Sequence, residues 1–120
     1  MVTHYDAYTW GNNCFGCRGI GNYEAVNHLT KITVGNITWT QVACGCHHSI
    51  ALSSNGEVFT WGHGIDGVLG LGDCVDRNVP TKVQYLSKER IVKVACGDDH
   101  SAALTSTGKL FTWYVLCDTF

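Results

Sequence analysis

Apolar and polar residues alternate along this chain in short runs separated by glycine-rich segments, a pattern typical of β-strands. The runs predict two groups of four strands, at 30–34, 38–44, 48–53 and 57–61, and at 80–85, 91–96, 100–105 and 109–114. No stretch shows a helical period of useful length, and only residues 86–91 have room for a single turn. The pattern therefore predicts an all-β chain.

Residues 42–61 and 94–113 are two copies of one stretch, separated by a constant 52 positions. Thirteen of the twenty aligned positions carry the same residue, whereas about one match is expected by chance at ordinary residue frequencies. A fixed period of this length indicates a solenoid or a propeller built from one repeated supersecondary unit.

Each copy has the pattern of a β-hairpin. Asn55-Gly56 separates two strand-like runs, and this pair favours a tight turn because both residues tolerate positive φ. The second copy has Thr107-Gly108 there, so only the glycine is kept. Small residues at 43–45 and 95–97, in the strand before each hairpin, predict the close approach of another backbone.

The repeat extends beyond the hairpins. The glycine-rich segment 12–22 aligns with 63–73 at an offset of 51, and each is followed by a short strand. We therefore expect repeat one at about 8–59, repeat two at about 60–111, and a non-repeat tail at 114–120. Four short strands per repeat are typical of a propeller blade.

The repeated residues resemble the regulator of chromosome condensation repeat family. The similar segments are 42–52 with Gly56 and 59–62, their counterparts 94–104 with Gly108 and 111–113, and the glycine loop 67–72. The resemblance implies a seven-bladed β-propeller, so we expect about two four-stranded antiparallel blades of an incomplete ring. A closed propeller needs about four to eight blades. We therefore interpret the chain as a fragment of a longer product, with one piece of an oligomeric ring or an incomplete gene model as alternatives. Open blade edges would permit self-association.

Composition excludes several classes of protein. Hydrophobic residues make up 45% and charged residues 15%, which indicates a folded chain. The net charge is −2 without a run of Lys or Arg, so direct nucleic-acid binding is not expected. No segment has the roughly 20 apolar residues of a membrane span. No signal peptide is recognisable, so we predict an intracellular protein, cytoplasmic or nuclear, whose seven cysteines are reduced thiols.

A histidine and a serine are adjacent in both repeats, as His48-Ser49 and His100-Ser101. Such a pair could suggest a nucleophile and its base. Neighbouring strand residues point to opposite faces, however, and cannot form that hydrogen bond. We therefore expect the histidine to bind a neighbouring backbone carbonyl, and we predict no catalytic residue.

Thiols and imidazoles at short spacing leave zinc as an alternative. The candidate ligands are Cys14, Cys17, Cys44, Cys46, His47 and His48. Cys44 recurs as Cys96 among small residues, which favours packing, and Ile65 and Val68 replace Cys14 and Cys17 in the second repeat. A redox role for Cys14 and Cys17 lacks the surrounding βαβ unit. We therefore predict no metal and no cofactor.

The recurrent tryptophans Trp10, Trp61 and Trp113 are predicted to lie in the core. The resemblance also implies an alternative, because tryptophans serve light sensing in one branch of the family. Their identical repeat position favours packing. Trp39 lies outside the repeated stretch and is predicted to be only a strand residue.

Function in repeat proteins usually lies in the loops that differ between repeats. The predicted partner-binding residues are Cys46, His47, Asp66, Asp73, Asp76, Arg77, Asp98 and Asp99. We predict a protein-interaction scaffold without enzymatic activity. The resemblance implies two alternatives, a guanine-nucleotide exchange factor for a small GTPase or the propeller module of a ubiquitin ligase.

Overall fold

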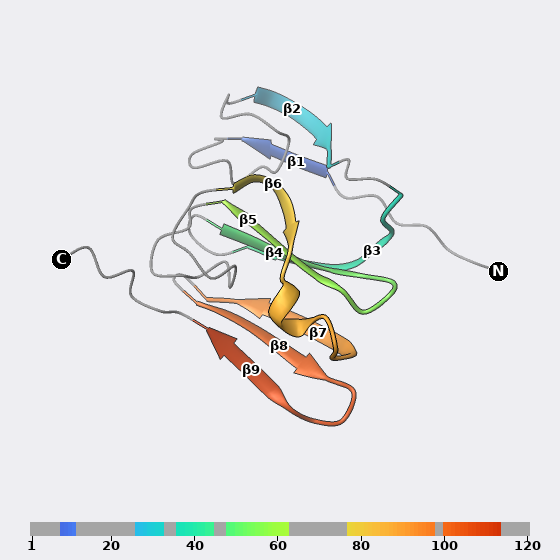
Figure 1. Cartoon of the computed structure of the whole chain (residues 1–120). Coiled ribbons are helices and arrows are strands. Elements are labelled where there is room, and N and C mark those ends of the chain that lie inside the picture. Colours follow the sequence, from blue (N-terminus) through green and yellow to red (C-terminus); the bar gives the residue numbers. More distant parts are fainter. Residues whose placement is uncertain are drawn as a thin grey trace.

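The computed structural model describes residues 8–11, 26–32, 36–44, 48–62, 77–97 and 100–113. These segments form three antiparallel sheets that lie one above another (Figure 1). The first sheet pairs β1 (Tyr8–Gly11) with β2 (Val26–Lys31). The second contains β3 (Trp39–Cys44), β4 (His48–Ser53), β5 (Val58–Gly62) and β6 (Arg77–Lys82) in that order. The third contains β7 (Ile91–Cys96), β8 (Ser101–Thr105) and β9 (Leu110–Trp113).

The alternating pattern placed most strands correctly, but it assigned the first strand of each group to the wrong sheet. The strand expected at 80–85 lies at 77–82 and pairs with β5, so it completes the preceding sheet instead of starting the next one. The strand expected at 30–34 is β2, which ends at Lys31 and pairs with β1. The turn expected at 86–91 begins earlier, as the 3₁₀ helix η3 (Gln84–Leu86).

The repeated sequence produces a repeated strand register. In the outer pairs, Tyr8 lies opposite Lys31 and Phe59 lies opposite Lys82, an offset of 51 in both strands. The inner pairs β3–β4 and β7–β8 match at an offset of 52, including a register shift after Trp39 and after Ile91. Each sheet therefore builds the same blade, and the extra residue falls in the connection between β6 and β7.

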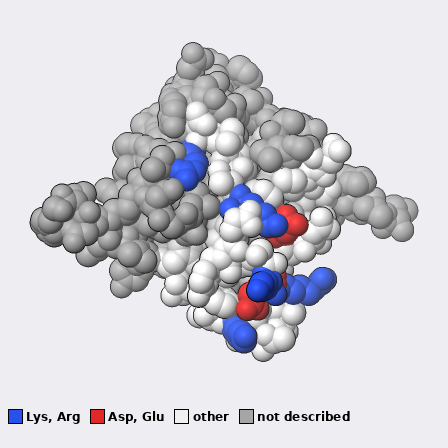
Figure 2. Space-filling model, viewed as in Figure 1, with Lys and Arg blue, Asp and Glu red and all other residues white. Residues whose placement is uncertain are grey.

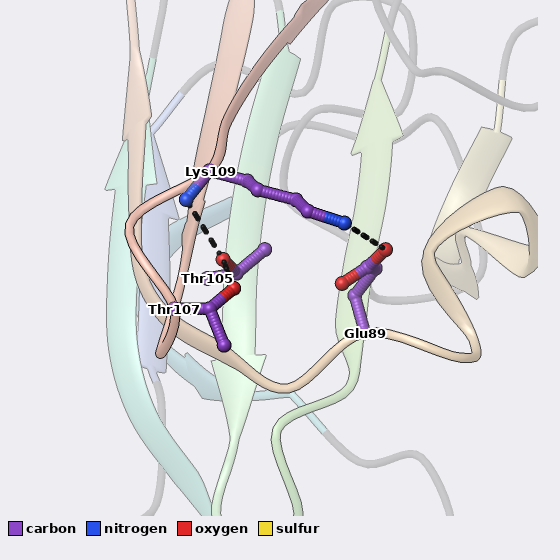
Figure 3. A network of polar contacts seen from close by, with 4 residues as sticks. All are labelled: Glu89, Thr105, Thr107 and Lys109. Atoms are coloured by element: carbon purple, nitrogen blue, oxygen red, sulfur yellow. Dashed lines mark hydrogen bonds and ion pairs between the residues drawn. The ribbon is translucent and has the colours of Figure 1, made fainter.

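Both β4–β5 and β8–β9 turns depend on the glycine that the repeats share. Gly56 and Gly108 adopt φ of 80° and 90°, which other L-residues rarely tolerate. Around Gly108, the Lys109 N–H donates to Thr105 Oγ1 at 3.0 Å, and that oxygen lies 3.0 Å from Thr107 Oγ1 (Figure 3). The Glu57 N–H donates to Ser53 Oγ in the same way, at 3.1 Å. At the position of Asn55 the second repeat has Thr107, whose hydroxyl takes part in the second turn.

Two apolar clusters pack between the sheets. The residues of one cluster have counterparts in the other at equivalent repeat positions. One cluster contains Ile32, Trp39, Ala51, Phe59 and Trp61. The other contains their counterparts Val83, Ile91, Ala103, Phe111 and Trp113, together with residues of β4 and β5. Burial of apolar surface at this second cluster holds the second and third sheets together.

Trp39 shows that one sequence interpretation was wrong. It begins β3 opposite Ser53, as Ile91 begins β7 opposite Thr105, so it occupies a repeat position. Its ring packs edge-on against Phe59, with centroids 5.2 Å apart, and lies 6.3 Å from Trp61. Trp61 is buried as predicted, whereas the side chain of Trp10 lies outside the described part of the structure.

Candidate protein-interaction site

The innermost strands β3 and β7 lie beside each other, and Gln41 joins them. Its side-chain amide donates to the Val92 carbonyl at 2.8 Å and accepts from the Val94 N–H at 3.0 Å. The amide therefore bonds the edge of β7 as a neighbouring strand would. Sequence comparison missed this contact because the equivalent residue of the second repeat is Lys93, which signals no shared role.

His48 forms a second link between the two blades. Its ring is buried, and Nε2 lies 3.3 Å from the carbonyl oxygen of His100. Because a carbonyl only accepts hydrogen bonds, Nε2 must carry the hydrogen. The predicted bond from this histidine to a backbone carbonyl is therefore confirmed, and the carbonyl belongs to the next repeat.

Ser49 bonds a neighbouring strand. Its hydroxyl donates to Cys44 Sγ at 3.7 Å. The equivalent His100 is exposed, and its ring lies over Gly97, where an added Cβ would come within 2.0 Å of Cε1. The small residue at 97 therefore makes room for the ring of His100. The backbone approach predicted for these small segments is seen beside it, where Cys96 Sγ bonds the Ala43 carbonyl.

Cys96 is a structural thiol. Its Sγ donates to the Ala43 carbonyl of the neighbouring blade at 3.8 Å. The pKa of this thiol is raised from 9.0 to about 12: burial is the main cause, the nearby Cys44 adds to it, and the hydrogen bond with Ser101 offsets it in part. At neutral pH Cys96 is therefore protonated, and it is neither a thiolate nucleophile nor a ready metal ligand.

The part of the chain that the structure describes contains no cluster of side chains that would support the zinc alternative. No group of three or more His, Cys, Asp and Glu side chains there is placed to hold a metal ion. Among the candidate ligands, Cys44 and His48 make the contacts given above. The others, Cys14, Cys17, Cys46 and His47, lie outside the described residues.

Of the eight predicted partner-binding residues, the structure describes only Arg77. It is half-buried and begins β6, opposite Gly62 at the end of β5. The other seven, which are Cys46, His47, Asp66, Asp73, Asp76, Asp98 and Asp99, lie outside the described residues. In sequence they follow the ends of β3, β5 and β7. Because neighbouring strands are antiparallel, these strand ends lie at one edge of the sheets (Figure 1).

Most described charges lie near the opposite edge of the sheets. Figure 2 shows Lys and Arg side chains interspersed with Glu over the region of η3 and β7–β9. Two of the basic residues are paired, Lys82 with Glu57 at 3.8 Å and Lys109 with Glu89 at 4.0 Å. Both pairs are partly solvent-exposed and contribute little to stability.

Comparison with known proteins supports the blade architecture. A family model described as "Regulator of chromosome condensation (RCC1) repeat" matches residues 6–52 and 55–104, and a second model of that description matches 39–67. The chain belongs to the regulator of chromosome condensation (RCC1) repeat family. The predicted family and all-β propeller fold are confirmed. The match to residues 55–104 covers β5 to β8. One RCC1 sequence repeat therefore contains the last two strands of the second sheet and the first two strands of the third.

Several RCC1-repeat proteins are similar to this chain. The human "Probable E3 ubiquitin-protein ligase HERC4" is 40% identical over 111 residues, which cover 90% of this chain and 10% of that protein. The Arabidopsis thaliana "RCC1 domain-containing protein RUG3, mitochondrial" is 45% identical over 107 residues, which cover 88% of this chain and 24% of that protein. The chain therefore spans about a tenth of HERC4 and a quarter of RUG3.

Solved RCC1-type structures share the arrangement of the sheets. Human WBSCR16 superposes with a TM-score of 0.77 at 32% identity, covering 89% of this chain and 28% of that one. Prp20p from Saccharomyces cerevisiae superposes with a TM-score of 0.80 at 24% identity, covering 91% of this chain and 29% of Prp20p. The second likeness shows the fold alone. In the described segments no helix is long and apolar enough to cross a membrane.

Proposed function

We propose that these RCC1 repeats form a protein-interaction module, with the partner bound by the segments that follow β3, β5 and β7. One observation carries the proposal: the two repeats share strand register and core positions but differ in these segments. Cys46 and His47 stand where the second repeat has Asp98 and Asp99. Rigid blades with variable connecting segments are the usual arrangement of a binding scaffold.

The contacts between blades support this role. Gln41 and His48 bond the backbone of the next repeat, and the shared apolar cluster packs between the sheets. The ends of β3 and β7 are therefore held in a fixed relation, so the points from which two of these segments start are preorganised. Preorganisation raises affinity because less freedom is lost on binding.

The proposal is tested by binding of a defined partner to matched variants. The first variant carries Cys46→Ser, His47→Ala, Asp98→Ala and Asp99→Ala, and the control carries Lys88→Ala and Arg90→Ala near the opposite edge. Both should unfold at the wild-type temperature. We expect the first variant to lose at least tenfold in affinity and the control to stay within twofold. Equal binding by both variants would contradict the proposal.

The class of partner is a further part of the proposal. Prp20p is described with binding properties to Gsp1p and histones, and HERC4 as a ubiquitin-protein ligase. We favour a protein partner and retain a small GTPase as the first candidate, with the ligase module as the second. Faster release of labelled nucleotide from a GTPase would support exchange. Binding without faster release would support the scaffold. An intracellular location, cytoplasmic or nuclear, remains a prediction.

A further inference from the structure

The β4–β5 and β8–β9 turns share one backbone arrangement. The Gly56 N–H donates to the Ser53 carbonyl at 3.1 Å, and the Gly108 N–H donates to the Thr105 carbonyl at the same distance. Both glycines have positive φ. The two turns therefore differ in their side chains, which lets the chemistry of one turn be compared with that of the other.

Asn55 gives the first turn a reactive group that the second lacks. It precedes Gly56, and this is the single Asn-Gly pair in the 120-residue sequence. Asn55 is exposed, and no described residue bonds its side-chain amide. The second turn has Thr107 at this position, and its hydroxyl lies 3.0 Å from Thr105 Oγ1. The backbone arrangement thus forms without an asparagine.

An asparagine followed by glycine can lose its side-chain amide without an enzyme. When the Gly56 nitrogen loses its proton, it attacks Cγ of Asn55 and ammonia leaves, which closes a succinimide ring. Water then opens the ring at either carbonyl and yields aspartate or isoaspartate. Nothing is oxidised or reduced, since one water is consumed and one ammonia is released. Glycine favours the attack because it has no Cβ and the greatest backbone freedom.

The position of Asn55 at a turn favours this reaction. The bond from the Gly56 N–H to the Ser53 carbonyl must open before the nitrogen can attack. Hydrogen bonds at exposed turns open at a low free-energy cost, whereas those within core strands open at a cost that approaches global unfolding. The fold therefore slows the reaction at Asn55 without preventing it.

The other described asparagines lack this combination of features. Asn27 and Asn78 lie within β2 and β6, where strand pairing restrains the backbone. Asn36 is exposed and lies in a turn, but the β-branched Ile37 follows it. A branched side chain obstructs the approach of the following nitrogen. Asn36 is therefore an internal control with similar exposure and a different neighbour.

The first turn also contacts the next blade. An added Cβ at Gly56 would lie 3.6 Å from the backbone N and O of Ile91 and 3.7 Å from Cγ of Arg90. Ile91 is buried and begins β7, whereas Arg90 is exposed. Isoaspartate adds one carbon to the backbone between residues 55 and 56, together with a negative charge. The modified turn must consequently shift against the start of β7.

We propose that Asn55 is a site of spontaneous deamidation, and that its isoaspartyl product loosens the contact between the β4–β5 turn and β7. The site lies outside the segments that follow β3, β5 and β7. The proposal therefore stands or falls separately from the proposed partner binding.

The first test follows the modification itself. The whole 120-residue chain is incubated at pH 8 and 37 °C, and peptide mapping by mass spectrometry follows each asparagine. An isoaspartyl methyltransferase with a labelled methyl donor detects the isoaspartyl product. We expect Asn55 to convert at least tenfold faster than Asn36, and Asn55→Thr to remove the methylation signal. Equal rates at the two residues, or conversion of Asn55 in urea but not in the folded chain, would overturn the proposal.

The second test concerns the contact with β7. Urea denaturation compares fresh and incubated chains of the wild type and of Asn55→Thr. We expect the wild-type midpoint to fall as isoaspartate accumulates and that of Asn55→Thr to stay constant. Fresh Asn55→Asp, which gains the charge without the extra backbone carbon, should stay close to the fresh wild type. An unchanged wild-type midpoint after conversion, or the same fall in Asn55→Thr, would overturn the effect on the blade contact.

Discussion

At the scale of single residues, Gln41 and His48 of the first repeat bond the second repeat, and only one of these two residues is the same in both repeats. A histidine recurs in both repeats, and the bond of His48 to a backbone carbonyl was predictable, whereas the exposed position of His100 was not. Gln41 was not predictable, because Lys93 replaces it in the second repeat. A contact between two repeats needs only one of the two equivalent side chains, so recurrence does not reveal it.

Removal of the Gln41 amide should weaken the junction between blades. Gln41→Ala leaves the Val94 N–H and Val92 carbonyl without this partner, so we expect a loss of about 1–2 kcal/mol in the free energy of unfolding. Lys93→Ala at the equivalent exposed position should change it by less than about 0.5 kcal/mol. Urea denaturation measures both. A similar loss in the two variants would show that the amide is not specifically required.

The two described thiols should differ in reactivity. Cys44 is exposed, whereas burial keeps Cys96 protonated with a pKa of about 12. At pH 8 we expect iodoacetamide to modify Cys44 well before Cys96, as mapped by mass spectrometry, and both at similar rates in urea. Rapid modification of Cys96 in the folded chain would contradict its burial.

The same thiol should make stability depend on alkaline pH. The pKa of Cys96 is raised on folding, so its contribution is fully present below about pH 9, where neither state ionises. As pH rises from about 9 to about 12, the unfolded chain loses this proton first and stability falls. Cys96→Ala should reduce that dependence in urea titrations at several pH values. An unchanged dependence would exclude Cys96 as its source.

At the scale of elements, the hairpins were the most predictable part of the fold. A strand's alternating pattern and a turn glycine act within a few residues, so the sequence alone located β3 to β5 and β7 to β9. The outer strand β6 was assigned to the wrong sheet, because its pattern does not specify its pairing partner. That choice depends on which strands become neighbours in space, which no local pattern reports.

The turn glycines should be required equally in the two repeats. Gly56→Ala and Gly108→Ala each place a Cβ on a residue with positive φ, so we expect each to lose about 1–2 kcal/mol in the free energy of unfolding. An added Cβ meets only ordinary contacts at Gly56 and none within 4 Å at Gly108. The loss should therefore be similar at both sites by urea denaturation. A much larger loss at Gly56 would indicate crowding by β7.

At the scale of the whole described molecule, equivalent residues have different surroundings because the sheets stack in order. Leu52 of β4 is buried against the third sheet, whereas Leu104 at the same repeat position of β8 is only half-buried. The family resemblance predicted the blades. It did not predict which blade faces would be covered.

Truncation of these two leucines should show whether burial or repeat position decides how much each contributes to the free energy of unfolding. Leu52→Ala removes apolar contacts from the cluster shared by two sheets, so we expect a loss of about 2–5 kcal/mol in the free energy of unfolding. Leu104→Ala should lose about 1 kcal/mol, since part of its side chain is already in water. Urea denaturation of both variants measures the difference. Equal losses would mean that the face of β8 is covered as fully as that of β4.

The sequence by itself determined the strand pattern, the turn glycines and the period of the repeat, since these follow from interactions over a few residues. Only the tertiary structure decided that β6 closes the sheet of β5 and that Gln41 bonds the edge of β7. The physical reason is that each of these depends on which strand lies next to another. The strands β5 and β9 have nearly the same sequence, yet in the described part β5 is buried and β9 is partly exposed.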